Sequence, residues 1–154
     1  MSHIFLPLCK CNRLFLIVAI LGFSLIGPIV ASCLPSPPAI DPSHVSRLSK
    51  FSLYLVALFL SPLIETVLFQ SLPVLIISKF RTSEVLLLLA VVLPFSIAHF
   101  MLAAPFPSLV NGLIGGFSLG VCYIVFMQDS HRRAFFITAV VHSAHNAIVL
   151  GFPS

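Results

Sequence analysis

Five long apolar segments, separated by polar or proline-rich stretches, dominate the sequence. They cover residues 13–31, 50–79, 83–104, 108–127 and 134–152. A helix needs about 20 mostly apolar residues to cross a lipid bilayer. Each segment therefore predicts a membrane-spanning helix, and the chain is expected to be an all-α, polytopic transmembrane helical bundle of about five helices.

The composition places the chain in the lipid bilayer. Hydrophobic residues make up 59% of the 154 residues and charged residues only 8%, whereas a soluble domain carries about 25% charged residues. The net charge of +4 comes from basic residues scattered beside the apolar segments. That distribution does not indicate a nucleic-acid partner, but it is typical of membrane orientation.

The basic residues favour one orientation of the bundle. With the N-terminus inside, the inner loops hold Lys10, Arg13, Lys79, Arg81, Arg132 and Arg133, and the outer loops hold only Arg47 and Lys50. Because positive charge collects on the cytoplasmic side, we expect the N-terminus inside and the C-terminus outside.

The chain is predicted to have three parts. Residues 1–33 form an N-terminal transmembrane helix, residues 34–49 form a proline-rich loop, and residues 50–154 form a helical core. Val30-Ala31-Ser32-Cys33 also resembles a lipoprotein cleavage box, so a cleaved signal segment is the alternative for the first part. We favour the helix, because further spanning helices follow it.

The cysteines are not interpreted as a metal site. Cys9 and Cys11 have no second cysteine or histidine pair at a metal-binding spacing and are expected to be free thiols near a terminus. Cys122 lies in an apolar segment and is expected to fill space in the core.

Glycines recur at every fourth position of the fourth segment, at Gly112, Gly116 and Gly120. Such a stripe lets another helix backbone approach closely. We interpret this helix as a packing wall, and because the stripe could face a helix of the same chain or of a second copy, the oligomeric state stays open.

Polar residues stand out inside the spanning segments. They are Glu65, Thr66, Gln70, His99, His142, His145 and Asn146. Ionisable residues at membrane depth usually face the bundle interior and mark function. Three pairs are four residues apart and so share one helix face: Thr66 with Gln70, Phe95 with His99, and His142 with Asn146.

One carboxylate, two histidines and an amide suit water-dependent hydrolysis. A carboxylate withdrawn from water is a good proton acceptor, and a histidine can relay the proton. A second histidine and an asparagine amide can donate hydrogen bonds to a developing oxyanion.

Three alternatives remain for these residues. A zinc ion on Glu65, His99 and His142, with water as the fourth ligand, is the minority alternative, and no other cofactor is expected. Thr66 and His145, taken singly, are interpreted as interhelical hydrogen-bonding residues. The third hypothesis is that the chain is a small transporter subunit that relays protons through Glu65 and the histidines.

On these residues the sequence resembles the CPBP (Abi) family of intramembrane proteases. The family includes type II CAAX prenyl endopeptidases and bacteriocin-processing or self-immunity proteins. Its motifs are Glu-Glu-x-x-x-Arg, Phe-x-x-x-His and His-x-x-x-Asn, on successive helices of one bundle. Residues 65–70 match the first in part, and residues 95–99 and 142–146 match the other two fully. The resemblance covers roughly residues 50 to 152.

The resemblance implies roles for four residues. Glu65 and His99 would activate water, and His142 and Asn146 would stabilise the oxyanion. The first motif departs from the family, because Thr66 replaces a glutamate and Gln70 replaces an arginine. We expect the two to replace an ion pair with a neutral pair that hydrogen-bonds across one helical turn, with Phe95 as a further supporting residue.

The sequence thus leads to two hypotheses from different classes. The first is an intramembrane glutamic-type endopeptidase of the bacterial cytoplasmic membrane, acting on a membrane-associated peptide. The second is a catalytically degenerate scaffold or bacteriocin-immunity factor built on the same bundle.

Overall fold

The computed structural model describes residues 5, 8, 11–35, 50–80, 83–102 and 105–151, and within them it contains helices and no strands. The predicted all-α fold is confirmed. Most of the predicted proline-rich loop, residues 36–49, and the predicted free thiol of Cys9 lie outside the described residues.

The first helix consists of α2 (Arg13–Ser24) and α3 (Ile26–Ser32). The second is a continuous run of α4 (Lys50–Leu55), the π-helical segment η2 (Val56–Leu60), α5 (Ser61–Glu65), a second π-helical segment η3 (Thr66–Ser71) and α6 (Leu72–Ile77). Three unbroken helices follow, α7 (Glu84–Leu102), α8 (Pro105–Met127) and α9 (His131–Gly151).

Five helical runs in the described residues are long and apolar enough to cross a membrane. They are Arg13–Ser32, Phe51–Ile77, Glu84–Met101, Phe106–Met127 and His131–Gly151. Large apolar side chains cover the outside of the bundle, with Phe51, Met101 and Val140 each more than half exposed. The chain is therefore an integral, multi-pass membrane protein whose apolar surface faces lipid.

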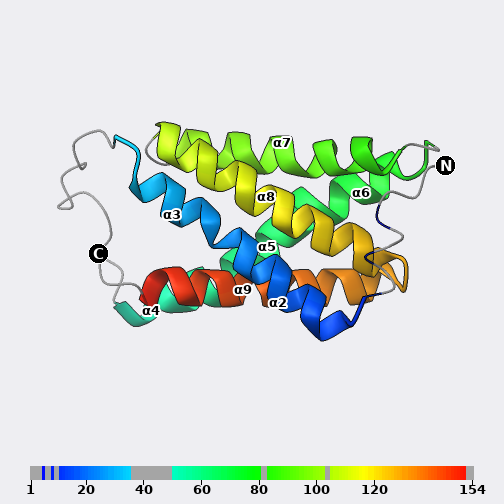
Figure 1. The fold of residues 1–154 in the computed structure, drawn as a ribbon, viewed down its shortest axis with the longest axis horizontal. Coiled ribbons are helices and arrows are strands. Elements are labelled where there is room, and N and C mark those ends of the chain that lie inside the picture. Colours follow the sequence, from blue (N-terminus) through cyan, green and yellow to red (C-terminus); the bar gives the residue numbers. More distant parts are fainter. Residues whose placement is uncertain are drawn as a thin grey trace.

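Helix α8 forms the centre of the bundle. It crosses in front of α7 and packs against α9, α2 and α3 (Figure 1). In its most apolar 18-residue stretch 61% of the residues are buried, against at most 33% in any other spanning helix of the described chain. Cys122 on this helix is fully buried, as a small packing residue should be.

The glycine stripe of α8 lies directly against α7. A Cβ added to Gly112 would come within 3.0 Å of both the Ser96 Cα and the His99 Cβ, and one added to Gly116 would lie 3.1 Å from the Phe95 ring. The predicted packing wall is confirmed, and the stripe packs within one chain. The same close approach holds the two motif residues of α7 in place.

Two prolines explain the two π-helical segments of the second helix. Pro62 and Pro73 each follow a π segment at the second position of the next α-helical stretch. A proline has no backbone N–H, and its ring collides with the carbonyl one turn earlier. Widening the preceding turn relieves that collision, and such π turns are frequent at functional sites.

Basic residues gather at one end of the bundle, while Lys10, Arg47 and Arg81 of the predicted charge distribution lie outside the described residues. At the end where α2 and α9 begin, Arg13 and Arg133 both bind Asp129, at 3.0 and 3.2 Å. Arg13 also lies over the ring of Phe126. These ion pairs tie the start of α2 to the turn between α8 and α9.

Candidate active site

Glu65 lies in the middle of the second helix and contacts α9. Its Oε1 accepts a hydrogen bond from the Ser61 hydroxyl one turn earlier. Its Oε2 lies 3.7 Å from Nε2 of His142, and the two side chains are 22% and 5% exposed. The structure therefore brings together two of the four predicted site residues as a carboxylate–imidazole pair.

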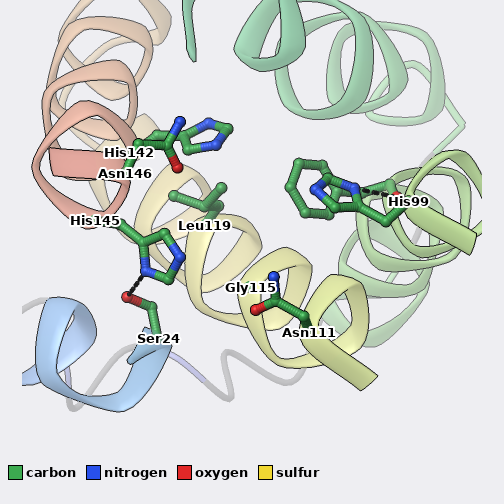
Figure 2. Close-up of a pocket in the computed structure, with 9 residues that line it drawn as sticks. Ser24, His99, Asn111, Gly115, Leu119, His142, His145 and Asn146 are labelled. Carbon is green, nitrogen blue, oxygen red and sulfur yellow. Dashed lines mark hydrogen bonds between the residues drawn. The ribbon is translucent and has the colours of Figure 1, made fainter. Parts of the chain in front are cut away.

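A polar cavity of about 50 Å³ lies on the other side of His142. Its lining comprises Ser24, Phe95, His99, Asn111, Gly115, Leu119, His142, His145 and Asn146 (Figure 2). A cavity needs roughly 10–15 Å³ to hold a water molecule. This space is large enough for water, and three of the four predicted site residues face it.

Glu65 does not line this cavity. His142 touches both the carboxylate and the cavity, so it connects them. The resemblance implies that Glu65 and His99 act on water together, whereas the structure joins Glu65 to the cavity through His142.

The ring of His99 has a defined tautomer. Its Nδ1 lies 3.0 Å from the carbonyl oxygen of Phe95. A carbonyl can only accept a hydrogen bond, so Nδ1 carries the proton and Nε2 of the neutral ring is a bare lone pair. His99 therefore presents a proton acceptor at the cavity.

Phe95 holds both histidine rings of the motifs. Its ring lies against His99 at a centroid distance of 4.3 Å and meets His142 edge-on at 5.9 Å. Phe69 in turn packs edge-on against the Phe95 ring, at a centroid distance of 5.7 Å. Phe95 is 3% exposed, and its predicted supporting role corresponds to this contact with both rings.

Asn146 is anchored by the proline distortion of the second helix. Its Nδ2 donates a hydrogen bond of 2.8 Å to the carbonyl of Ala57. In a π turn the carbonyl of one residue accepts a hydrogen bond from the N–H five residues later, as the Val56 carbonyl does from the N–H of Ser61. The corresponding partner of Ala57 is Pro62, which has no N–H. The asparagine amide supplies the missing donor.

Thr66 and Gln70 do not form the hydrogen bond that the sequence predicts. Both side chains are 0% exposed, and within the described chain the Thr66 hydroxyl and both polar atoms of the Gln70 amide have no hydrogen-bond partner. Both residues lie in the π segment that runs from Thr66 to Ser71 and share its buried face, but a shared face does not by itself turn two polar groups toward each other.

The π segments also shape the buried face of this helix. Pro62, Thr66, Gln70 and Val74 are all buried and spaced by four. In a regular α-helix, a step of four residues drifts by about 40° around the axis. Wider turns reduce that drift, so the stripe stays directed into the bundle.

Sequence reasoning missed three polar residues that contribute to the site. Ser61 binds Glu65, while Ser24 and Asn111 line the cavity. Each is a polar residue inside an apolar segment, which is the sequence signal that could have identified it as a site residue. The buried Oδ1 of Asn111 faces the backbone of Gly27, where an added Cβ would lie 2.7 Å from it.

The predicted zinc ligands are not arranged as a set. In the part of the chain that the structure describes, no three His, Cys, Asp or Glu side chains converge as a group that could hold a metal ion. Glu65 and His142 are neighbours, and His99 lies across the cavity (Figure 2).

Comparison with known proteins adds no relative. No family model, no curated protein and no solved structure matches this chain.

Proposed function

We propose that this chain is an intramembrane endopeptidase of the glutamic type, acting in the bacterial cytoplasmic membrane. The observation that carries the proposal is the Glu65–His142 pair, at 3.7 Å, beside a cavity that His99 and Asn146 also line. Charged groups at membrane depth are costly without a function. The resemblance of the three motifs to the CPBP family supports the same reading.

The chemistry follows from the tautomer of His99. Its bare Nε2 can accept a proton from water while the water oxygen forms a bond to the carbonyl carbon of the substrate. The carbonyl π electrons move to oxygen, and amide donors such as Asn146 can stabilise that oxyanion. The carbon–nitrogen bond then breaks, and the leaving amine takes the proton.

Glu65 acts through His142 in this scheme. The carboxylate lies 3.7 Å from Nε2 of the ring, and Ser61 donates a hydrogen bond to the carboxylate. Two atoms of the pair, Oε2 of Glu65 and Nδ1 of His142, are buried and without a hydrogen-bond partner among the described residues. Both are therefore available to a ligand.

The exposed face of the helix that carries Glu65 supports an apolar, membrane-associated peptide as substrate. A groove of about 330 Å³ lies on this face. It is lined by Leu63, Ile64, Val67, Leu68 and Phe135. An apolar segment within the bilayer could bind there, on the same helical segment as the carboxylate.

Replacing Glu65 by glutamine tests the proposal. In proteoliposomes with a library of membrane-anchored fluorogenic peptides, we expect the wild type to cleave and Glu65→Gln to lose on the order of 10³-fold in rate. The carboxylate that pairs with His142 is then gone, and general acid–base machinery contributes roughly 10²–10⁴-fold. Glu84→Gln, which changes a carboxylate at the start of α7, serves as the matched control. Wild-type cleavage by Glu65→Gln would show that the proposed carboxylate is not used.

A non-catalytic scaffold is the second candidate. Two observations favour it: Glu65 does not line the cavity, and Nδ2 of Asn146 already binds Ala57. This candidate predicts that Glu65→Gln and His99→Ala keep the cellular phenotype, while a bulky residue in the glycine stripe abolishes it.

A further inference from the structure

Ser24 connects the first helix to the cavity. It is 2% exposed, and its hydroxyl makes two contacts, one of 2.7 Å to the carbonyl of Leu21 and one of 2.9 Å to Nδ1 of His145. The first helix lies outside the region that carries the three motifs, so none of them anticipates this contact.

The two contacts fix where the protons are. A serine hydroxyl has a single hydrogen, and the Leu21 carbonyl, which can only accept, takes it. Towards His145 the Ser24 oxygen must then accept, so Nδ1 of the ring carries a proton. In the neutral ring, Nε2 of His145 is left as a bare lone pair.

Pro28 explains why Ser24 stands at this place. A regular helix would bond the N–H of residue 28 to the carbonyl of Ser24, but proline has no N–H. The helix breaks at Leu25, between α2 and α3. The break directly follows Ser24 and lies beside α8 and α9 (Figure 1).

We propose that Ser24 is a positioning residue that holds His145 as the Nδ1-protonated tautomer, so that the cavity carries a second bare imidazole nitrogen in addition to that of His99. Figure 2 shows His145 with one ring nitrogen bound to Ser24 and the other turned towards the cavity. The site thus contains two proton acceptors from two helices, of which the motifs provide only one.

Two acceptors that line one small cavity define its ligand. The matching molecule donates hydrogen bonds and must fit a cavity of about 50 Å³. Water meets both conditions. In the peptidase this water is the nucleophile, a step that rests on the proposed function, whereas the tautomer of His145 follows from the hydrogen bonds alone.

The ¹⁵N spectrum of histidine tests the tautomer without a substrate. Protein labelled with ¹⁵N-histidine is studied in lipid nanodiscs, and His145→Asn identifies the resonances of His145 by their loss. We expect a protonated Nδ1 and a bare Nε2 in the wild type. Ser24→Ala should change the tautomer ratio about threefold to tenfold, the value of one net hydrogen bond, and Ser24→Thr should preserve it.

Ser32 provides the matched control for this experiment. Its hydroxyl also donates to the carbonyl three residues earlier, at 2.7 Å from Ile29, on the exposed part of α3. Ser32→Ala should therefore leave the His145 resonances unchanged. A wild-type His145 protonated at Nε2, or an unchanged tautomer ratio in Ser24→Ala, overturns the proposal.

Cleavage kinetics test the use of the second acceptor. His145→Asn keeps a donor for Ser24 but has no Nε2, so we expect kcat to fall about 100-fold with KM nearly unchanged. If Glu65→Gln is inactive while His145→Asn cleaves at the wild-type rate, the endopeptidase stands and the role of His145 is wrong. If no peptide is cleaved, the endopeptidase fails, and the spectra still decide the tautomer.

Discussion

The contact between α7 and α8 and the contact between the second helix and α9 differ in backbone regularity and in how their buried polar groups are paired. Along the α7–α8 contact, glycines allow the backbones to meet closely, and the buried hydroxyls of Ser96 and Ser118 bond the preceding turn of their own helices. Along the contact of the second helix with α9, π turns widen the backbone, and buried Thr66 and Gln70 lack partners within the described chain.

The difference indicates that the α7–α8 contact stabilises the bundle, whereas the contact of the second helix with α9 carries the candidate chemistry. The α7–α8 contact holds Phe95 and His99 through close backbone approach and a hydrogen bond from His99 to the Phe95 carbonyl, as a rigid support requires. The second helix carries Glu65, with π-helical backbone on either side of it and unpaired polar side chains, Thr66 and Gln70, in the segment that follows. Unsatisfied buried groups cost about 1–3 kcal/mol each, so they persist where function selects them. Substitutions in the two contacts should therefore act in opposite directions.

The largest effect is expected from Gly116→Leu in the glycine stripe. Its Cβ alone would lie 3.1 Å from the Phe95 ring and 3.4 Å from the Val92 backbone. Forcing a larger side chain into a filled contact costs about 1–3 kcal/mol, and here the backbones must separate. We expect unfolding in mixed micelles to show a loss of about 3 kcal/mol.

Gly22→Leu is the control for this prediction. Gly22 lies on α2, and an added Cβ there meets nothing within 4 Å. Its substitution should change the unfolding free energy by less than about 0.5 kcal/mol, as at other exposed sites. Equal losses from both substitutions would mean that glycine matters through the helix backbone and not through the contact with α7.

The opposite sign is expected from Gln70→Met in the second helix. Methionine has a similar shape and removes two buried polar atoms that have no partner among the described residues. We expect the unfolding free energy to rise by about 1–2 kcal/mol. Ser96→Ala, which removes a buried hydroxyl bonded to Val92 at 2.7 Å, should lower it. A loss of stability in Gln70→Met would reveal a bound partner of the amide, such as an internal water.

The contrast also explains what the sequence could predict. Apolar length is enough to find five spans, and small residues spaced by four are enough to find the face of α8 that packs. Spacings of four grouped His99 with Phe95 and His142 with Asn146 correctly, because α7 and α9 are regular helices there. Such rules work wherever the helix is unbroken.

The same rules fail in the second helix. Spacing alone predicted a Thr66–Gln70 hydrogen bond, and the two side chains do share the buried face of the π segment, but within the described chain their polar atoms have no partner. Ser24 was missed because a single serine in an apolar run has many neutral explanations. Only the fold places it against His145, 121 residues later.

The smallest expected effect tests whether Pro62 is the reason that Asn146 binds Ala57. Removing the amide in Asn146→Leu leaves the Ala57 carbonyl without its donor and should cost about 1 kcal/mol, within the range of interhelical hydrogen bonds in membranes. In a Pro62→Ala background, residue 62 regains an N–H that can bond that carbonyl across the π turn. Asn146→Leu should then cost less.

A double-mutant cycle on the unfolding free energy measures this dependence. We expect a coupling of about 0.5–1 kcal/mol between positions 62 and 146, as for residues that share one hydrogen-bond network. Additive losses would mean that the carbonyl of Ala57 is not freed by the proline. A positive coupling would show that the irregular backbone itself creates the anchor of a motif residue, because a regular helix at residues 56–60 would leave Asn146 no carbonyl to bind.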